Sequence, residues 1–236
     1  MKRHKSSEYY QVLILRTVGN FLILSSLFMI GKTFYQPVTQ EVRFFIENSL
    51  HKKYYISGDI PLKTLSQKDG NVPKGLLAKA LNIKPAEILI PEDANFSIVI
   101  PKIGANAKVL SNIDAGNENI YLSALKKGVA QAAGTAYPGE GGHVFLFAHS
   151  TDYIWNIGTY NAVFYLLYKL ENGDEINLFY QGQRYVYKVI DKKIVDPSQV
   201  EYLTRKTNIE FLTLQTCWPP GTTLKRLLVL ATRVAN

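Results

Sequence analysis

Cysteine is nearly absent from this chain: its 236 residues include one, Cys217. A single cysteine excludes an intramolecular disulfide framework, and it excludes a zinc site built from several thiolates. Internal repeats and low-complexity tracts are also missing. Hydrophobic residues make up 47% of the chain and charged residues 19%, which excludes a largely disordered chain. The length fits one ordinary domain with extra sequence, or at most two small domains.

A concentrated positive face is missing as well. The formal net charge is +8, and residues 1–59 and 60–236 each carry +4 of it. The first quarter of the chain therefore holds half of the excess, and the remainder is only mildly basic. Because there is no dense stripe of Lys and Arg, we expect no nucleic-acid partner.

One long uncharged run lies near the N-terminus, where residues 17–31 contain no charged side chain. Fifteen helical residues rise only about 22 Å, whereas the hydrocarbon core of a bilayer is roughly 30 Å thick. Residues 12–15 add another turn if the guanidinium of Arg16 snorkels toward the headgroups. The sequence therefore predicts a transmembrane anchor at residues 12–31.

A cleaved signal peptide is the rival interpretation of this run. Such a peptide ends in a small-x-small cleavage site, but the residues after Ile30 are Gly-Lys-Thr-Phe-Tyr-Gln-Pro. We therefore expect the anchor to stay uncleaved in the cell membrane. Lys2, Arg3 and Lys5 precede the run, so the positive-inside rule places residues 1–11 in the cytoplasm and the residues after the anchor outside it.

Residues 32–95 are mixed in character. Residues 40–53 have a helical apolar pattern, residues 73–82 suggest a second short helix, and glycines and prolines lie between and after them. We predict an extracytoplasmic stalk with short helices and little packing.

From residue 96 onward the sequence changes to short runs rich in Val, Ile, Leu, Phe and Tyr. We expect strands at residues 96–103, 143–148, 174–180, 184–190, 210–216 and 226–234, a hairpin loop at 181–183, and helices at 119–127 and 160–170. Many short strands with long connections predict a closed or nearly closed β-barrel over residues 96–236.

Cys217 is the first candidate for chemistry. It ends an apolar run and is followed by Trp218-Pro-Pro-Gly221, through which a strand cannot continue. We therefore expect the thiol at a strand end, on the rim of the barrel. The competing interpretation is a buried small hydrophobic residue, the usual state of a free cysteine. An idle exposed thiol outside the cytoplasm is a liability, which favours a functional role.

A thiol nucleophile needs a base or an imidazolium partner, and two histidines flank one predicted strand. If that strand runs parallel to the Cys217 strand, His149 at its end shares a rim with Cys217. His143 follows a Gly-Gly turn, and we expect it to be solvated. Lys225 and Arg226 open the last strand, and the loop before them is long enough to return Arg226 to the same rim as an oxyanion donor. Either residue equally fits a surface charge.

These residues resemble the motifs of the sortases, the bacterial cell-surface transpeptidases. Thr213-Leu-Gln-Thr-Cys217 resembles their Thr-Leu-x-Thr-Cys signature, Phe147-Ala-His-Ser150 their histidine motif, and Arg226 the family arginine. Similar blocks in the same order lie at residues 96–103, 125–130, 134–142 and 195–198. The short Cys–Arg spacing and the Trp-Pro-Pro loop depart from the pattern. The chain looks closer to class D or E than to the pilus-building type.

The resemblance implies a mainly β fold, the eight-stranded sortase barrel with short helices, after an N-terminal transmembrane helix. It implies that Cys217 attacks the Thr–Gly bond of an LPxTG-like sorting signal, that His149 transfers protons, and that Arg226 holds substrate and stabilises the oxyanion. Thr216 would assist in substrate binding. The acyl-enzyme would be resolved by an amine on a cell-wall precursor or another protein, or by water. No metal or organic cofactor is required.

Two alternatives stay open at this stage. A cysteine hydrolase of cell-wall peptides would share the Cys/His pair but release its products instead of joining them. A non-enzymatic surface-binding or scaffold domain would need none of the three candidate catalytic residues.

Overall fold

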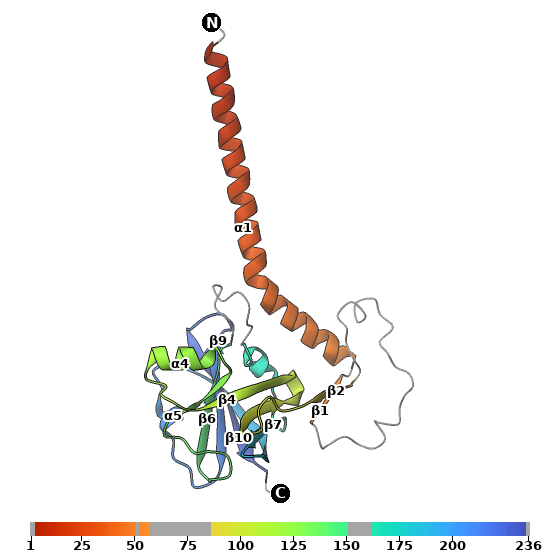
Figure 1. The fold of residues 1–236 in the computed structure, drawn as a ribbon, viewed down its shortest axis with the longest axis vertical. Helices are drawn as coiled ribbons and strands as arrows, with labels where there is room; N and C mark the ends of the chain where they lie inside the picture. The colour runs from red at the N-terminus through yellow and green to blue at the C-terminus, as the bar shows by residue number, and fades with distance from the viewer. Residues whose placement is uncertain (1–2, 51, 57–85, 151–161, 235–236) are drawn as a thin grey trace. The chain divides into compact units, whose positions relative to one another are not determined.

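A computed structural model describes residues 3–50, 52–56, 86–150 and 162–234. The chain divides into two compact units, Met1–Phe45 and Ile46–Asn236. Helix α1 (Arg3–Ser49) forms the first unit and its last residues belong to the second (Figure 1). The helical pattern predicted at residues 40–53 falls largely within α1, and the helix predicted at 73–82 lies outside the described residues.

The apolar part of α1 is a candidate membrane span. Residues Glu8–Lys32 form 25 helical residues with a mean hydropathy of 1.9, and they include the predicted anchor at 12–31. Large apolar side chains such as Phe21 and Phe28 are exposed in this stretch. A long run of exposed apolar side chains suits a lipid environment better than water. Length and composition equally fit a signal sequence, so an uncleaved anchor stays a prediction.

Eight strands of the second unit close into a β-barrel in the order β10-β8-β7-β3-β4-β5-β6-β9 (Figure 1). The strands are β3 (Phe96–Ile100), β4 (Ala105–Ile113), β5 (Val129–Ala132), β6 (His143–Phe147), β7 (Glu175–Tyr180), β8 (Gln183–Val195), β9 (Phe211–Trp218) and β10 (Lys225–Arg233). The mainly β fold and the eight-stranded barrel predicted from the sequence are confirmed.

The connections follow the local sequence signals. β3 ends at Ile100, earlier than predicted, because Pro101 lacks an N–H for the ladder and begins the 3-10 turn η1 (Pro101–Ile103). The predicted hairpin between β7 and β8 has Gln181 and Gly182 at φ of 50° and 76°, as a two-residue turn with positive φ at both positions requires. The predicted helices correspond to α4 (Glu118–Leu125) and to the short 3-10 helix η2 (Tyr165–Lys169).

Alternation along the strands separates an inner core from an outer layer. The interior is filled by fully buried residues that include Ile98, Leu146, Leu178, Tyr187, Leu214 and Val229. On the outer face, Phe145 and Phe147 of β6 pack beside α4, and Phe211 and Leu228 pack beside α5 (Glu201–Thr204). Burying one such side chain contributes roughly 1.5–3 kcal/mol, so these clusters hold β6, β9 and β10 firmly in register.

Two further strands lie outside the barrel. β1 (Lys53–Ile56) and β2 (Ala86–Leu89) form a parallel pair, and buried Ile56 and Leu89 pack on Val99 of β3. β3 is four strands from β9 in either direction around the barrel, so the pair covers the wall opposite the Cys217 strand. The expectation of little packing in residues 32–95 is wrong for these strands, which are too short to give a recognisable pattern.

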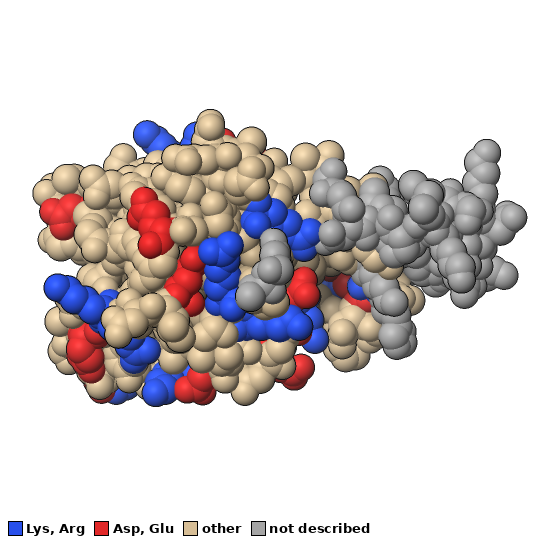
Figure 2. All heavy atoms as spheres, turned by 90° about the horizontal axis from the view of Figure 1, so that it is seen from below, with Lys and Arg blue, Asp and Glu red and all other residues tan. Residues whose placement is uncertain are grey.

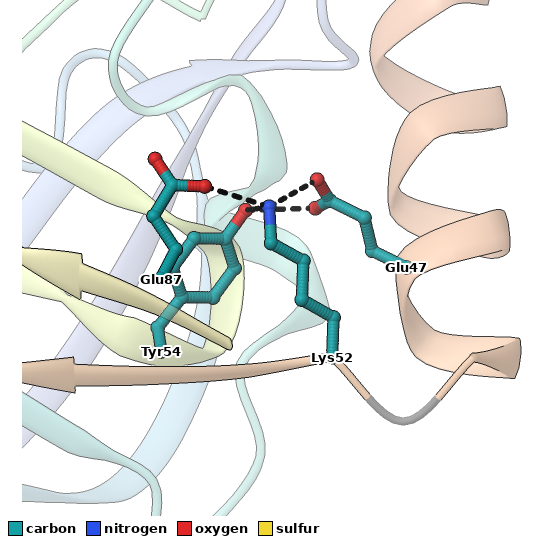
Figure 3. A network of polar contacts seen from close by, with 4 residues as sticks. All are labelled: Glu47, Lys52, Tyr54 and Glu87. Atoms are coloured by element: carbon teal, nitrogen blue, oxygen red, sulfur yellow. Dashed lines mark hydrogen bonds and ion pairs between the residues drawn. The ribbon is translucent and has the colours of Figure 1, made fainter. Parts of the chain in front are cut away.

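Lys52 ties the pair to the end of α1 (Figure 3). Its Nζ donates to Glu47 Oε1 at 2.8 Å, to Glu87 Oε2 at 2.9 Å and to the Tyr54 hydroxyl at 2.9 Å. The Lys52 side chain is 2% exposed. Burial alone would lower the pKa of Lys52, but the two carboxylates outweigh it and hold the pKa above its ordinary value. The ammonium group therefore stays charged and joins three segments of the second unit.

Candidate active site

Cys217 and Arg226 are brought together by the β9–β10 hairpin. The two strands are antiparallel, and Arg226 is the direct register partner of Cys217. The predicted return of Arg226 to the Cys217 rim is confirmed. Because Leu227 and Val229 of β10 and Leu214 of β9 point into the core, alternation places Arg226 and Cys217 on the outer face of the barrel.

His149 reaches the same rim from the other side of β9. β6 and β9 run parallel with Phe147 opposite Gln215, and the Ala148 N–H continues the ladder to the Gln215 carbonyl at 3.1 Å. The parallel pairing on which the sequence argument for His149 depended is therefore present. His149 follows Phe147 by two residues, so it lies at the same end of the parallel pair as Cys217. The fold therefore brings the three residues to one rim of the barrel, Cys217 and Arg226 as register partners and His149 just past the end of β6.

Cys217 is half-buried and its thiol is free. Burial raises the pKa of the Cys217 thiol because it disfavours the thiolate, while the positive charge of Arg226 acts in the opposite direction. The guanidinium therefore favours the thiolate, the form that acts as a nucleophile. Arg226 and Cys217 are coupled electrostatically as well as by strand register.

The two basic residues at the start of β10 have different partners. Arg226 Nη1 donates to the carbonyl of Thr223 at 3.2 Å and to that of Lys225 at 3.1 Å. The Lys225 ammonium instead forms an exposed ion pair with Asp196 at 2.7 Å. This arrangement favours Arg226 over Lys225 as the cation of the site.

Thr216 of β9 is buried, with 3% of its surface exposed. Its hydroxyl donates to the Ala148 carbonyl at 2.9 Å, next to His149. The contact holds the end of β6 against β9 and so helps to set the His149–Cys217 spacing. A direct contact between Thr216 and substrate stays a prediction.

His143 lies at the other end of β6, about 20 Å from His149 for six residues of extended strand. The expectation that it is solvated is wrong, because it is 5% exposed and lies beside the Phe145 and Phe211 rings. Its Nε2 hydrogen-bonds the Thr213 hydroxyl at 2.8 Å. Burial lowers the pKa of His143 to about 4, so the ring is neutral at physiological pH. His143 is a structural residue of the β6–β9 seam.

An aromatic contact at the end of β9 was not singled out in the sequence. Trp218 follows Cys217 and lies with its ring centroid 5.4 Å from that of Tyr168 in η2. Lys192 Nζ donates to the Tyr168 carbonyl at 2.8 Å and fixes η2 in place. The tryptophan next to the cysteine was visible in the sequence, but its partner lies fifty residues earlier.

The charged residues and possible metal ligands of the described part of the chain indicate no second type of site on the face shown in Figure 2. On the face shown in Figure 2, basic and acidic side chains are interspersed. Within the described part of the chain, no three His, Cys, Asp or Glu side chains gather in a way that could hold a metal ion.

Comparisons with known proteins identify the family. The family model described as the sortase domain matches residues 98–234, which is more than half of the chain. The chain belongs to the sortase family. Over 138 residues it is 30% identical to sortase D of Bacillus subtilis (strain 168), a match that covers 57% of this chain and 61% of that protein. The match thus spans less than two thirds of that relative.

Solved sortases share the barrel. Sortase C-1 from Actinomyces oris is 30% identical with a TM-score of 0.51, over 61% of this chain and 76% of that chain. Sortase C2 of Group B Streptococcus pilus island 1 is 26% identical with a TM-score of 0.50, over 59% of this chain and 73% of that chain. Similarity to both D and C sortases leaves the class of this chain a prediction.

Proposed function

We propose that this sortase is a membrane-anchored transpeptidase that cleaves an LPxTG-like sorting signal between Thr and Gly and joins the acyl product to an amine at the cell surface. The observation that supports the proposal is that Arg226 is the register partner of Cys217, while β6, which ends two residues before His149, runs parallel to β9. Nucleophile, proton carrier and cation need this proximity to act on one carbonyl group.

The first half-reaction forms a thioester. The Cys217 thiol gives its proton to His149, and Sγ attacks the carbonyl carbon of the Thr–Gly bond. The N–H groups of Arg226 face the oxygen on which negative charge develops. When the C–N bond breaks, His149 returns the proton to the leaving amine, and the Thr acyl group remains on Cys217.

The second half-reaction restores the enzyme. An amine, such as one on a cell-wall precursor, attacks the thioester carbonyl while His149 removes its proton. The new amide forms, the C–S bond breaks, and the proton returns to Cys217. Water in place of the amine would give hydrolysis, the outcome expected of the alternative, a cysteine hydrolase of cell-wall peptides.

The proposed location follows from the apolar stretch of α1 and the basic residues before it. Residues 1–11 lie in the cytoplasm, residues 12–31 span the membrane, residues 32–95 form the extracytoplasmic stalk, and residues 96–236 form the catalytic domain. A reporter enzyme fused after Asn236 should be active only outside the cytoplasm. Reporter activity in the cytoplasm would contradict this orientation.

The deciding experiment uses the full-length protein in detergent or vesicles. A library of fluorogenic peptides that vary around LPxTG is incubated with and without an added amine, and products are identified by mass spectrometry. A ligated product that requires Cys217 supports the transpeptidase, whereas cleavage that never yields ligation supports the hydrolase. Absence of Cys217-dependent cleavage across the library would contradict both. The cleaved sequences would also place the chain in class D, class E or another class.

A further inference from the structure

The loop between Cys217 and Arg226 is closed by one residue that the mechanism above does not use. The Thr222 hydroxyl donates to the Pro219 carbonyl at 2.8 Å, and the Thr222 backbone N–H donates to the same carbonyl at 3.0 Å. Two donors from one residue on one acceptor define a turn that begins directly after the Cys217-Trp218 end of β9.

This turn positions the Thr223 carbonyl, which accepts a hydrogen bond from Arg226. Thr223 follows Thr222, and its carbonyl accepts Arg226 Nη1 at 3.2 Å. The other contact of the guanidinium is the Lys225 carbonyl, next to Arg226 in the strand. In the described part of the chain, Arg226 Nε and Nη2 have no hydrogen-bond partner, so they are available to a ligand. The direction of the guanidinium therefore depends on where the turn holds Thr223.

We propose that Thr222 is a positioning residue: its hydroxyl shapes the Pro219–Leu224 loop so that the Thr223 carbonyl holds the Arg226 guanidinium beside Cys217. Its effect on rate rests on the proposed function, but its effect on Arg226 does not. An arginine side chain has several rotatable bonds, and restricting them before substrate binds reduces the entropy lost in the transition state.

Thr223 offers a matched control. Its side chain is exposed, and its hydroxyl forms no hydrogen bond in the described structure, whereas its carbonyl is the acceptor for Arg226. Thr223→Val and Thr222→Val therefore remove the same hydroxyl from adjacent positions of one loop, but only the second removes the bond to Pro219. Thr222→Ser keeps the donor and should behave as the parent does.

The first test measures how Cys217 responds to Arg226. Because the chain contains one cysteine, the rate of alkylation by iodoacetamide as a function of pH gives the pKa of the Cys217 thiol in the full-length protein. Arg226→Ala should raise that pKa, and Thr222→Val should raise it by at least a third as much. Thr223→Val and Thr222→Ser should match the parent. If Thr222→Val also matches the parent, the proposal is wrong.

The second test measures catalysis on a sorting peptide that the parent cleaves. Thr222→Val should lower kcat by roughly 3- to 10-fold, the value of one hydrogen bond, with KM within two-fold of the parent and an unchanged melting temperature. Equal kcat in Thr222→Val and Thr223→Val would overturn the proposal. If the parent shows no Cys217-dependent cleavage, the proposed function fails, and the alkylation experiment still decides the role of Thr222.

Discussion

Arg226 lies directly opposite Cys217 in the β9–β10 ladder, and its positive charge counters the effect of burial on the thiol. The loop between them, whose length departs from the family pattern in the sequence, is therefore long enough to place the two residues opposite each other. A hairpin register is set by its turn, so a change in this loop moves the arginine relative to the nucleophile.

Cys217→Ala should abolish acyl transfer and leave the barrel folded. The side chain is half-buried on the outer face, so loss of sulfur creates little cavity. The measurement is peptide cleavage together with circular dichroism. Full activity in this variant would refute thiol catalysis, since the chain has no other cysteine.

His149→Ala should lower the rate of cleavage, whereas His143→Ala should lower the stability of the fold. Loss of His149 should slow cleavage by about 10²-fold or more, because it removes the proton carrier. Loss of His143 should keep kcat within a few-fold but reduce the free energy of unfolding by about 1–3 kcal/mol, because the buried Thr213 hydroxyl loses its partner. Rates and urea melts of both variants decide the matter. An essential His143 beside a dispensable His149 would contradict the proposed site.

Because His143 is buried in its neutral form, we expect the fold to lose stability in acid. Its folded-state pKa of about 4 lies below the ordinary value of 6.5, so the unfolded chain binds the proton more readily. Stability from this group is present above pH 6.5 and is lost as the pH falls toward 4. The loss amounts to at most about 3 kcal/mol. His143→Gln should flatten the slope of unfolding free energy against pH in this window, and an unchanged slope would assign it to other groups.

Substitutions of Arg226 and of Lys225 should have different effects on the rate of peptide cleavage. Arg226→Ala should reduce the rate by about 10²-fold or more, and Arg226→Lys should restore only part of it, because an ammonium lacks the planar guanidinium fork. Lys225→Ala should stay within a few-fold of the parent, since it loses only an exposed ion pair with Asp196. The reverse order of effects would mean that Lys225 supplies the cation.

Lys52→Met should destabilise the second unit. The substitution leaves Glu47 and Glu87 without their shared cation, and we expect the free energy of unfolding to fall by about 2–4 kcal/mol. Lys108→Met is the control, because its ion pair with Asp93 involves a half-exposed lysine. Equal melting temperatures for the two variants would show that the Lys52 cluster adds little. Peptide cleavage should be retained where the protein is folded, since the pair covers the opposite wall.

Local sequence signals were sufficient for much of the site. Trp218-Pro219-Pro220 must end a strand, so Cys217 had to lie at a strand end. Runs rich in Val, Ile, Leu, Phe and Tyr predicted six of the eight barrel strands. The loop before Arg226 is long enough to fold back and return Arg226 to the Cys217 rim. These predictions hold because each depends on neighbours within about ten residues.

Other features depended on contacts between distant segments. β4 is rich in polar residues and β5 has four residues, so neither has a local pattern that distinguishes it from a loop. The β1–β2 pair was predicted as loosely packed stalk because its strands are too short to give a recognisable pattern, and its buried residues form a core only against Val99 and Phe179 of the barrel. His143 follows a glycine turn, yet Phe211, almost seventy residues later, covers it. Sequence therefore determined where strands end and turn, whereas burial was decided by the tertiary structure, because the side chains that exclude water come from remote parts of the chain.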